Sequence, residues 1–211
     1  MVYSPDYQYI PPLNFRVVTG FYDFFCGIFG LGKGFKQSIL QVAEIQDGPS
    51  ILDIGCGTGI FLEVAKTKFP KSRVVGIDPD QKALEIARNR LEKKHLEAEL
   101  EKGFAEALPF ADETFDFCFS TLTLHHLPNE IKRTALGEMR RVLRIGGTGI
   151  ITDIGPSKSW FWRKVLVFEK LEYLEGNLQG LVPRYLEEAG FREQKVALKK
   201  FPAILTIVVR K

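Results

Sequence analysis

Short apolar segments alternate with longer amphipathic ones from Ser50 onward, and this alternation constrains the fold more than any other feature of the sequence. The pattern predicts strands at 51–54, 73–77, 96–100, 115–119 and 149–152, and helices at 60–68, after Asp80 and at 131–143. Gly146 and Gly147 predict a turn before the last of these strands. Short strands that alternate with helices form a parallel sheet covered by helices on both faces. Two further strands, predicted at 194–200 and 203–209, are too close for a helical crossover and should form an antiparallel hairpin at one edge. The sequence therefore predicts an α/β fold with a doubly wound, mostly parallel, seven-stranded sheet, a C-terminal hairpin and a helical cap.

Length and composition are those of one globular domain with a cap. The chain has 211 residues, 45% of them hydrophobic and 26% charged, and its formal net charge is +3. This balance excludes disorder and gives no argument for a nucleic-acid surface. We expect an N-terminal arm and lid helices over residues 1–47, with an amphipathic helix at 35–45, and a core over residues 48–211. Within that core, residues 156–182 should form a cap or substrate-wall insertion with a helix at 160–174, and a further helix is predicted at 183–189.

Cysteine content and apolar stretches bear on the location of the protein. Cys26, Cys56 and Cys118 are too few for a disulfide framework, so we expect a reducing, cytoplasmic location. The most apolar stretch, 15–31, is broken by Asp23 and three glycines and makes a poor membrane span. We interpret it as a broken helix that lies over a pocket or on a membrane surface, which leaves peripheral membrane contact as an alternative.

The central chemical signal is the Gly-rich turn DIGCGTG at 53–59, which follows a predicted strand and precedes a helix. Glycines let the backbone approach a ligand at the carboxyl end of a strand, where open parallel sheets bind ligands. The spacing is G-x-G-x-G, because Ile60 stands where a dinucleotide site has its third glycine. Asp53 would repel a pyrophosphate but suits an amine, and Asp78, at the end of the second strand, suits a ribose diol. The implied ligand carries a ribose and a positive charge.

Several motifs, in this order, resemble those of the class I S-adenosylmethionine-dependent methyltransferases. They are ILDIGCGTG (51–59), VVGIDPD (74–80), GFAEALPF (103–110), FDFCFSTLTLHHL (115–127), EMRRVLRIGG (138–147) and EEAGF (187–191). The resemblance covers the chain from about Gly48 onward, and it is greatest for the branch that includes the quinone-biosynthesis C-methyltransferases. It implies a Rossmann-like sheet, S-adenosyl-L-methionine as the methyl donor and S-adenosyl-L-homocysteine as the product.

This resemblance also implies a set of cofactor-binding residues. Asp53 and the backbone of the turn would hold the methionine part, and Asp78 would bind the ribose hydroxyls. Pro79, Ala105 and Glu106 would lie at the adenine. Ser120 and Thr121 would reach the methionine amine through their carbonyls, and Tyr22 would touch the cofactor if the N-terminal helix closes over it. The full set is Asp53, Gly55, Cys56, Gly57, Thr58, Gly59, Asp78, Pro79, Ala105, Glu106, Ser120, Thr121 and Tyr22.

Candidate catalytic residues follow the fourth and fifth predicted strands. Histidine can act as a general base near neutral pH, and His125 or His126 is expected in the substrate cleft, with His125 as the candidate base. Alternatively, one histidine packs against the sheet and the other is a solvated loop residue. Asp153 faces the expected cleft mouth, or else serves as a helix cap or turn acid. Cys56 and Cys118 are interpreted as packing residues without ligand-like spacing to histidine, so we predict no metal.

The sequence constrains only the chemical class of the methyl acceptor. The segment STLT at 120–123 is not the N/D-P-P-Y/F motif of enzymes that methylate adenine or glutamine nitrogens. The aromatic segments 15–31 and 160–168 favour a small apolar acceptor, such as a quinone precursor or a lipid, although packing of cap helices also explains them. Arg140, Arg141 and Arg144 are interpreted as a solvated helix end, and no nucleic-acid partner is expected. The alternatives are methylation of a protein or RNA, and cofactor binding without catalysis; the sequence gives no oligomeric state.

Overall fold

The computed structural model describes residues 30–156, 171–200 and 203–211. The predictions for the N-terminal arm, Tyr22, Cys26 and the aromatic segment 160–168 lie outside the described residues. Among the helices that the structure describes, none is long and apolar enough to cross a membrane.

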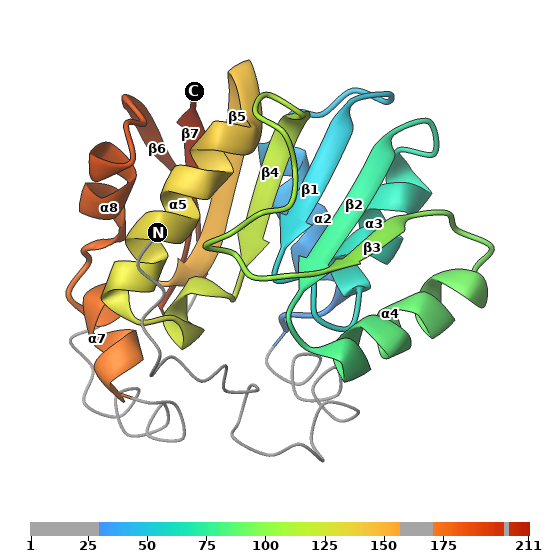
Figure 1. Ribbon diagram of the computed structural model, residues 1–211, viewed down its shortest axis with the longest axis horizontal. Coiled ribbons are helices and arrows are strands. Elements are labelled where there is room, and N and C mark those ends of the chain that lie inside the picture. Colours follow the sequence, from blue (N-terminus) through green and yellow to red (C-terminus); the bar gives the residue numbers. More distant parts are fainter. Residues whose placement is uncertain (1–29, 157–170, 201–202) are drawn as a thin grey trace.

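The described residues form a seven-stranded sheet with the strand order β3-β2-β1-β4-β5-β7-β6 (Figure 1). The first five strands in this order run parallel, whereas β7 is antiparallel to both β5 and β6. The strands are β1 Ser50–Ile54, β2 Arg73–Asp78, β3 Glu99–Lys102, β4 Phe115–Thr121, β5 Leu143–Ile154, β6 Glu193–Lys200 and β7 Ile204–Arg210. The predicted doubly wound sheet with an antiparallel hairpin at one edge is confirmed.

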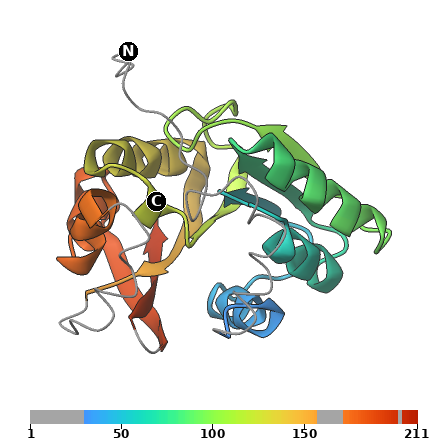
Figure 2. The ribbon, with the colours of Figure 1, turned by 90° about the horizontal axis from the view of Figure 1, so that it is seen from below.

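Helices cover both faces of the sheet, as Figure 2 shows for α2 and α5 on opposite sides. They are α2 Lys33–Val42, α3 Ile60–Lys68, α4 Gln81–Glu92, the 3₁₀ turn η2 Leu124–His126, α5 Asn129–Val142, α7 Leu171–Leu178 and α8 Val182–Glu188. Alternate residues of β1 serve the two layers: Ile51 packs in the cluster of α2, α3 and α4, and Leu52 in the cluster of α5 and α8. Burial on both faces explains why the central strands are apolar without interruption.

Most element bounds agree with the sequence pattern, and the disagreements lie at the periphery. The helix predicted at 60–68 is α3, and Asp80 caps α4 by accepting a hydrogen bond from the Lys82 N–H at 2.9 Å. The strand predicted at 96–100 is instead the short edge strand β3, because pairing with β2 begins only at Glu99. Its solvent-exposed position explains why apolar alternation misplaced it.

The turn predicted at Gly146–Gly147 is wrong, because β5 runs without a break from Leu143 to Ile154. Between the pairs Phe115–Leu143 and Phe117–Thr148, β5 advances five residues while β4 advances two. The extra residues form an irregularity within the strand, and Gly146 accommodates it with a φ of +77°. A Gly-Gly pair thus marks a bulge here and not the end of an element.

The carboxyl ends of the parallel strands lie along one edge of the sheet, the lower edge in Figure 1. The Gly-rich turn follows β1, the segment Asp78–Asp80 follows β2, η2 follows β4, and Gly155 follows β5. Four turns that are distant in sequence therefore meet at the edge where open α/β sheets bind ligands.

We predict that Gly59→Ala destabilises the fold, because Gly59 is the N-cap of α3 with a φ of +78° and an added Cβ would lie 2.8 Å from the Cβ of Ala87. The expected loss in the free energy of unfolding is about 1–3 kcal/mol, measured by urea denaturation. Gly137→Ala is the control, since Gly137 lies within α5 in open space and should gain up to about 1 kcal/mol. Equal stability of Gly59→Ala and the wild type would contradict this account.

Candidate functional site

The Gly-rich turn folds back onto the end of β2. The N–H groups of Gly55 and Cys56 both donate to the carbonyl of Ile77, at 2.8 and 3.1 Å, and the Gly57 N–H donates to Asp78 Oδ2 at 2.9 Å. A Cβ on Gly55 would lie 2.3 Å from the hydroxyl of Thr123, so only glycine lets this turn contact the segment after β4. The predicted cofactor residues of β1 and β2 are therefore brought together.

Asp53 is a buried carboxyl group at the end of β1, only 2% exposed. Its Oδ1 atom has no hydrogen-bond partner among the described residues. Burial raises the pKa of Asp53 to about 7; Lys36 opposes this rise and the nearby Asp78 adds to it. A buried acid with an unsatisfied oxygen is costly unless a donor or a cation completes it, so this position fits the ammonium group of a ligand.

Asp78 is also buried, but its two oxygens already accept backbone hydrogen bonds, from Gly57 at Oδ2 and from Asp80 at Oδ1, each at 2.9 Å. Burial raises its pKa to about 6, although these two bonds act in the opposite direction. Each carboxylate oxygen can accept more than one hydrogen bond. The backbone therefore fixes the orientation of Asp78 and leaves it able to accept from a ribose diol.

The end of β4 carries two more incompletely bonded side chains. The hydroxyls of Ser120 and Thr121 are buried and have no partner among the described residues. The next residue, Leu122, has a φ of +58°, an uncommon value for a bulky residue and one that is often found at functional sites. The sharp turn directs the chain from β4 into η2.

Thr123 connects this turn with the rest of the site, and the sequence analysis missed it. Its hydroxyl lies 3.3 Å from the carbonyl of Ile54 in β1, and its N–H donates to Asp153 Oδ2 at 3.1 Å. A single threonine in a loop carries no periodic or motif signal, so only the folded structure shows that it links three strand ends.

The residues expected at the adenine lie on two connections at the same edge. Pro79 follows β2, and Ala105 and Glu106 follow β3; all three are half-buried. Burial raises the pKa of Glu106. Phe104 forms a backbone bridge with Ala107, and its side chain offers no polar group to an adenine.

His125 and Asp153 form a buried pair, with Nδ1 of the histidine 2.7 Å from Asp153 Oδ1. Asp153 Oδ2 accepts from the N–H of Thr123 and from that of Leu124 at 2.8 Å, and Oδ1 accepts from its neighbour Ile154 at 2.7 Å. Burial acts to raise the pKa of Asp153, but His125 and these bonds together lower it. Asp153 is thus a turn-forming acid, one of the two sequence interpretations, and it is also the partner of a histidine.

His126 lies beside the buried pair, and the two described cysteines lie in the core. The His126 ring is half-buried and lies against His125, with ring centroids 3.9 Å apart. Cys56 and Cys118 are buried, and burial raises the pKa of both thiols, as expected for packing residues. No cluster of His, Cys, Asp or Glu that could hold a metal ion exists in the described part of the chain.

An ion-pair network centred on the buried Glu63 braces the Gly-rich turn from the outside, and the sequence analysis missed this too. Arg90 of α4 donates to the carbonyl of Thr58 at 2.9 Å and lies 3.3 Å from Glu63 Oε2, while Lys33 of α2 donates to Glu63 Oε1 at 2.6 Å. Burial acts to raise the pKa of Glu63, but the two cations lower it. The available signal was an acid in the apolar face of the 60–68 helix.

These features define a class of protein. A Rossmann-like sheet, a G-x-G-x-G turn after β1 and buried acids at the ends of β1 and β2 form the site of a nucleoside-containing cofactor that carries a positive charge. S-adenosylmethionine has the matching groups, namely a ribose diol, an ammonium and a sulfonium.

Comparison with known proteins agrees with this assignment. A family model described as a methyltransferase domain matches residues 51–147. A demethylmenaquinone methyltransferase of Desulfitobacterium hafniense is 33% identical over 71% of this chain and 60% of its own length. A ubiquinone/menaquinone biosynthesis C-methyltransferase UbiE of Xylella fastidiosa is 28% identical over 89% of this chain and 74% of its own. The structure of a Haemonchus contortus phosphoethanolamine N-methyltransferase 2 in complex with S-adenosyl-L-methionine matches with a TM-score of 0.72 at 22% identity, over 88% of this chain and 44% of the other.

Residues 51–147 match the methyltransferase-domain family, and together with these relatives they indicate a class I S-adenosylmethionine-dependent methyltransferase, a class whose cofactor is S-adenosylmethionine. The chain spans 60% of the length of the Desulfitobacterium relative, and the likeness to the Haemonchus structure concerns the fold.

We predict that binding of S-adenosylmethionine tightens as the pH rises from 5.5 to 7. Asp53, with a pKa of about 7, must lose its proton to hold a cation, so the dissociation constant should fall by up to about tenfold per pH unit below 7 and level off above it. Asp53→Asn should leave only the part of this pH dependence that Asp78, with a pKa of about 6, contributes, and should weaken binding about 10- to 100-fold, as measured by calorimetric titration. Asp112→Asn, which changes an exposed acid on the loop before β4, serves as the control and should behave as the wild type. A pH-independent wild type would contradict the role of Asp53.

Proposed function

We propose that this chain transfers a methyl group from S-adenosyl-L-methionine, by direct in-line displacement, to a small apolar acceptor of the quinol class. The observation that carries the proposal is the set of buried, unpartnered polar atoms at the cofactor edge: Asp53 Oδ1, Ser120 Oγ and Thr121 Oγ1. Natural proteins leave few such groups unsatisfied, so their concentration at one edge supports a ligand with donors at this place. When bound, the cofactor supplies an electrophilic methyl group on a sulfonium.

The proposed cofactor contacts follow from two kinds of polar group: those that lack a hydrogen-bond partner, and those that backbone hydrogen bonds hold in a fixed orientation. Asp53 pairs with the ammonium, the backbone of the turn after β1 lies along the methionine part, and Asp78 accepts from the ribose. Pro79, Ala105 and Glu106 border the adenine. The buried hydroxyls of Ser120 and Thr121 add to the carbonyl contacts expected from the sequence.

The acceptor class rests on the names of two relatives and on ring chemistry. Those relatives act, by their names, on demethylmenaquinone and on ubiquinone or menaquinone precursors. A quinol ring carbon is electron-rich and attacks an electrophilic methyl group, whereas the oxidised quinone ring is electron-poor. Attack from a ring carbon then requires loss of the proton on that carbon or on a quinol hydroxyl, which gives a general base a role.

We assign this base to His125, with Asp153 as its positioning residue. The carboxylate of Asp153 at 2.7 Å favours the proton on Nδ1 and leaves Nε2 as the basic nitrogen. Three backbone N–H groups hold the carboxylate in place, so the histidine is oriented by a rigid partner. The ring of His126 lies against that of His125 at an interplanar angle of 42°, on the same turn.

The arginines near the end of α5 give no support to a nucleic-acid acceptor. Arg141 donates to Glu138, Asp112 and two carbonyls, Arg144 pairs with Asp116 at 2.7 Å, and Arg140 donates to the carbonyl of Gly190. Because these side chains serve to fix loops of the fold, they are not arranged to bind phosphates. A small-molecule acceptor is therefore the partner that we propose, in the cytoplasm, with peripheral membrane contact where the acceptor resides in a bilayer.

We predict transfer of label to an organic-soluble product when the protein is incubated with methyl-labelled S-adenosylmethionine and a demethylmenaquinone that has been reduced to its quinol. The acceptor is tested in detergent and in phospholipid vesicles, and the oxidised quinone is the control, for which no transfer is expected. A cell extract run in parallel widens the acceptor range. Label found only in protein or RNA would overturn the proposal, and cofactor binding without any transfer would point to a non-catalytic role.

We predict that His125→Gln lowers turnover of the quinol by about 10²- to 10⁴-fold, the usual contribution of a general base, with the dissociation constant for S-adenosylmethionine within about twofold of wild type. His126→Gln is the matched comparison on the neighbouring residue and should cost less than about tenfold. Turnover is followed by label transfer and the cofactor affinity by calorimetry. A His125→Gln variant that keeps a wild-type rate would remove His125 from the mechanism.

A further inference from the structure

Two fully buried polar side chains lie next to the His125–Asp153 pair and play no part in the cofactor site. Lys132 of α5 and Asn177 of α7 both have 0% exposure. A lysine and an asparagine are among the residues least expected inside a core, because their polar groups lose water on burial. Apolar residues would pack α5 against α7 at lower cost, so the polar contacts of these two side chains need an explanation.

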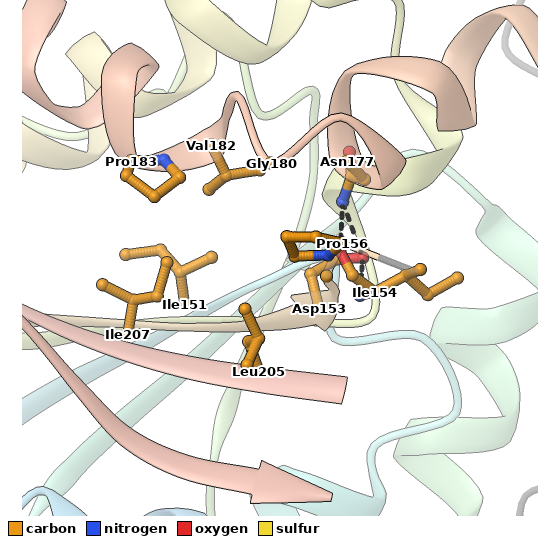
Figure 3. A pocket seen from close by; sticks show the side chains of 11 residues that line it. Ile151, Asp153, Ile154, Pro156, Asn177, Gly180, Val182, Pro183, Leu205 and Ile207 are labelled. Carbon is orange, nitrogen blue, oxygen red and sulfur yellow. Dashed lines mark hydrogen bonds between the residues drawn. The ribbon is translucent and has the colours of Figure 1, made fainter. Parts of the chain in front are cut away.

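Asn177 connects α7 directly to the catalytic pair. Its side-chain amide donates to Asp153 Oδ1 at 3.2 Å and to the carbonyl of Ile154 at 3.0 Å. Figure 3 shows these two bonds reaching from α7 down to the end of β5. The same Oδ1 atom holds Nδ1 of His125, so Asn177 and His125 share one carboxylate oxygen.

Lys132 ties α7 to α5 from the other side. Its ammonium donates to the backbone carbonyl of Tyr173 in α7 and, at 3.2 Å, to Asn129 Oδ1. Burial lowers the pKa of Lys132 to about 8, while the charge of Asp153 acts to raise it. At neutral pH, Lys132 is therefore mostly a buried cation within electrostatic range of Asp153.

At Gly176, α7 packs closely against α5 and α8. A Cβ on Gly176 would lie 2.3 Å from Asn129 Oδ1 and 3.1 Å from the hydroxyl of Tyr185. The helix begins where the described part of the cap resumes, at Leu171, and it contacts η2, the turn that carries both histidines. One short helix therefore closes over the turn, the lysine and the catalytic pair together.

A cavity of about 50 Å³ separates the connection after α7 from β5 and β7, on the other side of Asp153 and Asn177 (Figure 3). Its remaining lining is apolar, including Ile151, Val182 and Leu205. This volume holds a few waters at most and does not admit an aromatic acceptor. On the side of this cavity, the amide of Asn177 provides contacts between α7 and the end of β5, whereas Leu174 packs α7 into the apolar core.

We propose that Lys132 and Asn177 are positioning residues that latch α7 onto Asp153 and thereby fix the orientation and charge environment of His125. The catalytic consequence of this latch rests on the proposed function of His125. Among the described residues, His125 contacts Asp153 on β5 and His126 on η2, Lys132 on α5 interacts with the charge of Asp153, and α7 adds the neutral amide of Asn177. A cation that acts on Asp153 also opposes a positive charge on its partner His125, and Asn177 competes for the oxygen that His125 uses.

Histidine ¹⁵N NMR of the free protein tests this latch without an acceptor. The signals of His125 are assigned by comparison with His125→Gln, and its ring is titrated in the wild type, in Lys132→Met and in Asn177→Ala. Lys132→Met should raise the titration midpoint of His125 by about 0.5 pH unit or more, since a nearby cation is removed. Asn177→Ala should also raise the titration midpoint of His125, and it should weaken the preference of this ring for one tautomer.

Lys211→Met is the matched control. Lys211 is also largely buried and donates to two backbone carbonyls, those of Arg141 and Leu143, at the opposite end of α5. It should lower thermal stability as Lys132→Met does but leave the His125 titration at its wild-type midpoint. Lys132→Arg, which keeps the charge, should restore the wild-type midpoint wherever it folds.

A measurement on the wild-type protein covers the case in which the variants do not fold. In lysine-labelled protein, the Nζ signal of Lys132 should shift with the same midpoint as the His125 ring. The latch is overturned if Lys132→Met and Asn177→Ala lower stability yet leave His125 unchanged, or if the Lys132 signal ignores the titration of His125. Failure of His125→Gln to slow methyl transfer would remove His125 from the mechanism, and absence of any methyl transfer would refute the proposed function; both would leave these NMR results standing, so the failures are distinguishable.

Discussion

A buried carboxylate destabilises a protein unless donors or a cation surround it, and three of them lie at the carboxyl edge of this sheet. Asp153 receives hydrogen bonds from three backbone N–H groups, a histidine and an amide. Asp78 receives two from the backbone, and Asp53 keeps one oxygen without any partner in the described residues. The number of hydrogen bonds that the protein donates to each acid decreases from Asp153 on β5 to Asp78 on β2, and Asp53 on β1 keeps an oxygen with none. Where the protein supplies the fewest donors, a cationic ligand has the most to add, and that places the cofactor over β1 and β2.

The three acids also differ in pKa, in the same order. Burial raises the pKa of Asp53 and Asp78 to about 7 and about 6, whereas His125 and the surrounding bonds lower that of Asp153. Asp153 is therefore a permanent anion that organises η2 and α7. The other two acids change their protonation in the range where a cation binds, and so they couple cofactor binding to pH. At one edge of the sheet, Asp153 therefore stays ionised while Asp53 and Asp78 have pKa values near neutrality.

Local patterns predicted the central strands and α3 because those segments are buried on both faces and their apolar runs have no competing explanation. Prediction failed where a partner distant in sequence decides the outcome. The Gly146–Gly147 pair is a turn signal by itself, but pairing with β4 makes it an irregularity within β5. The ordered glycine and acid motifs predicted a candidate cofactor site, whereas the pair of His125 and Asp153 could be named only residue by residue, since 28 positions separate the two.

The residues that the sequence did not reveal share one property: they are polar side chains whose role depends on a contact between elements. Lys132 lies on an amphipathic helix where a lysine is ordinarily solvated, and nothing local indicates that α7 covers it. Asn177 follows Gly176 in a short helix that no motif marks. Such side chains contribute little to specifying the fold class, which apolar periodicity already determines. They determine which atoms are held still within that fold, and this is why fold alone does not determine chemistry in this class.

Thr123 shows how the two halves of the site are joined. Its hydroxyl faces the carbonyl of Ile54 at the end of β1, its N–H donates to Asp153, and a side chain at Gly55 would collide with it. The cofactor turn and the histidine turn therefore contact each other through one small residue with little room to move. A displacement of the turn after β1 toward Thr123 would also disturb the hydrogen bond from Thr123 to Asp153. Because Asp153 also accepts hydrogen bonds from His125 and from Asn177 of α7, Thr123 joins the proposed cofactor side of the site to the side that carries the proposed base.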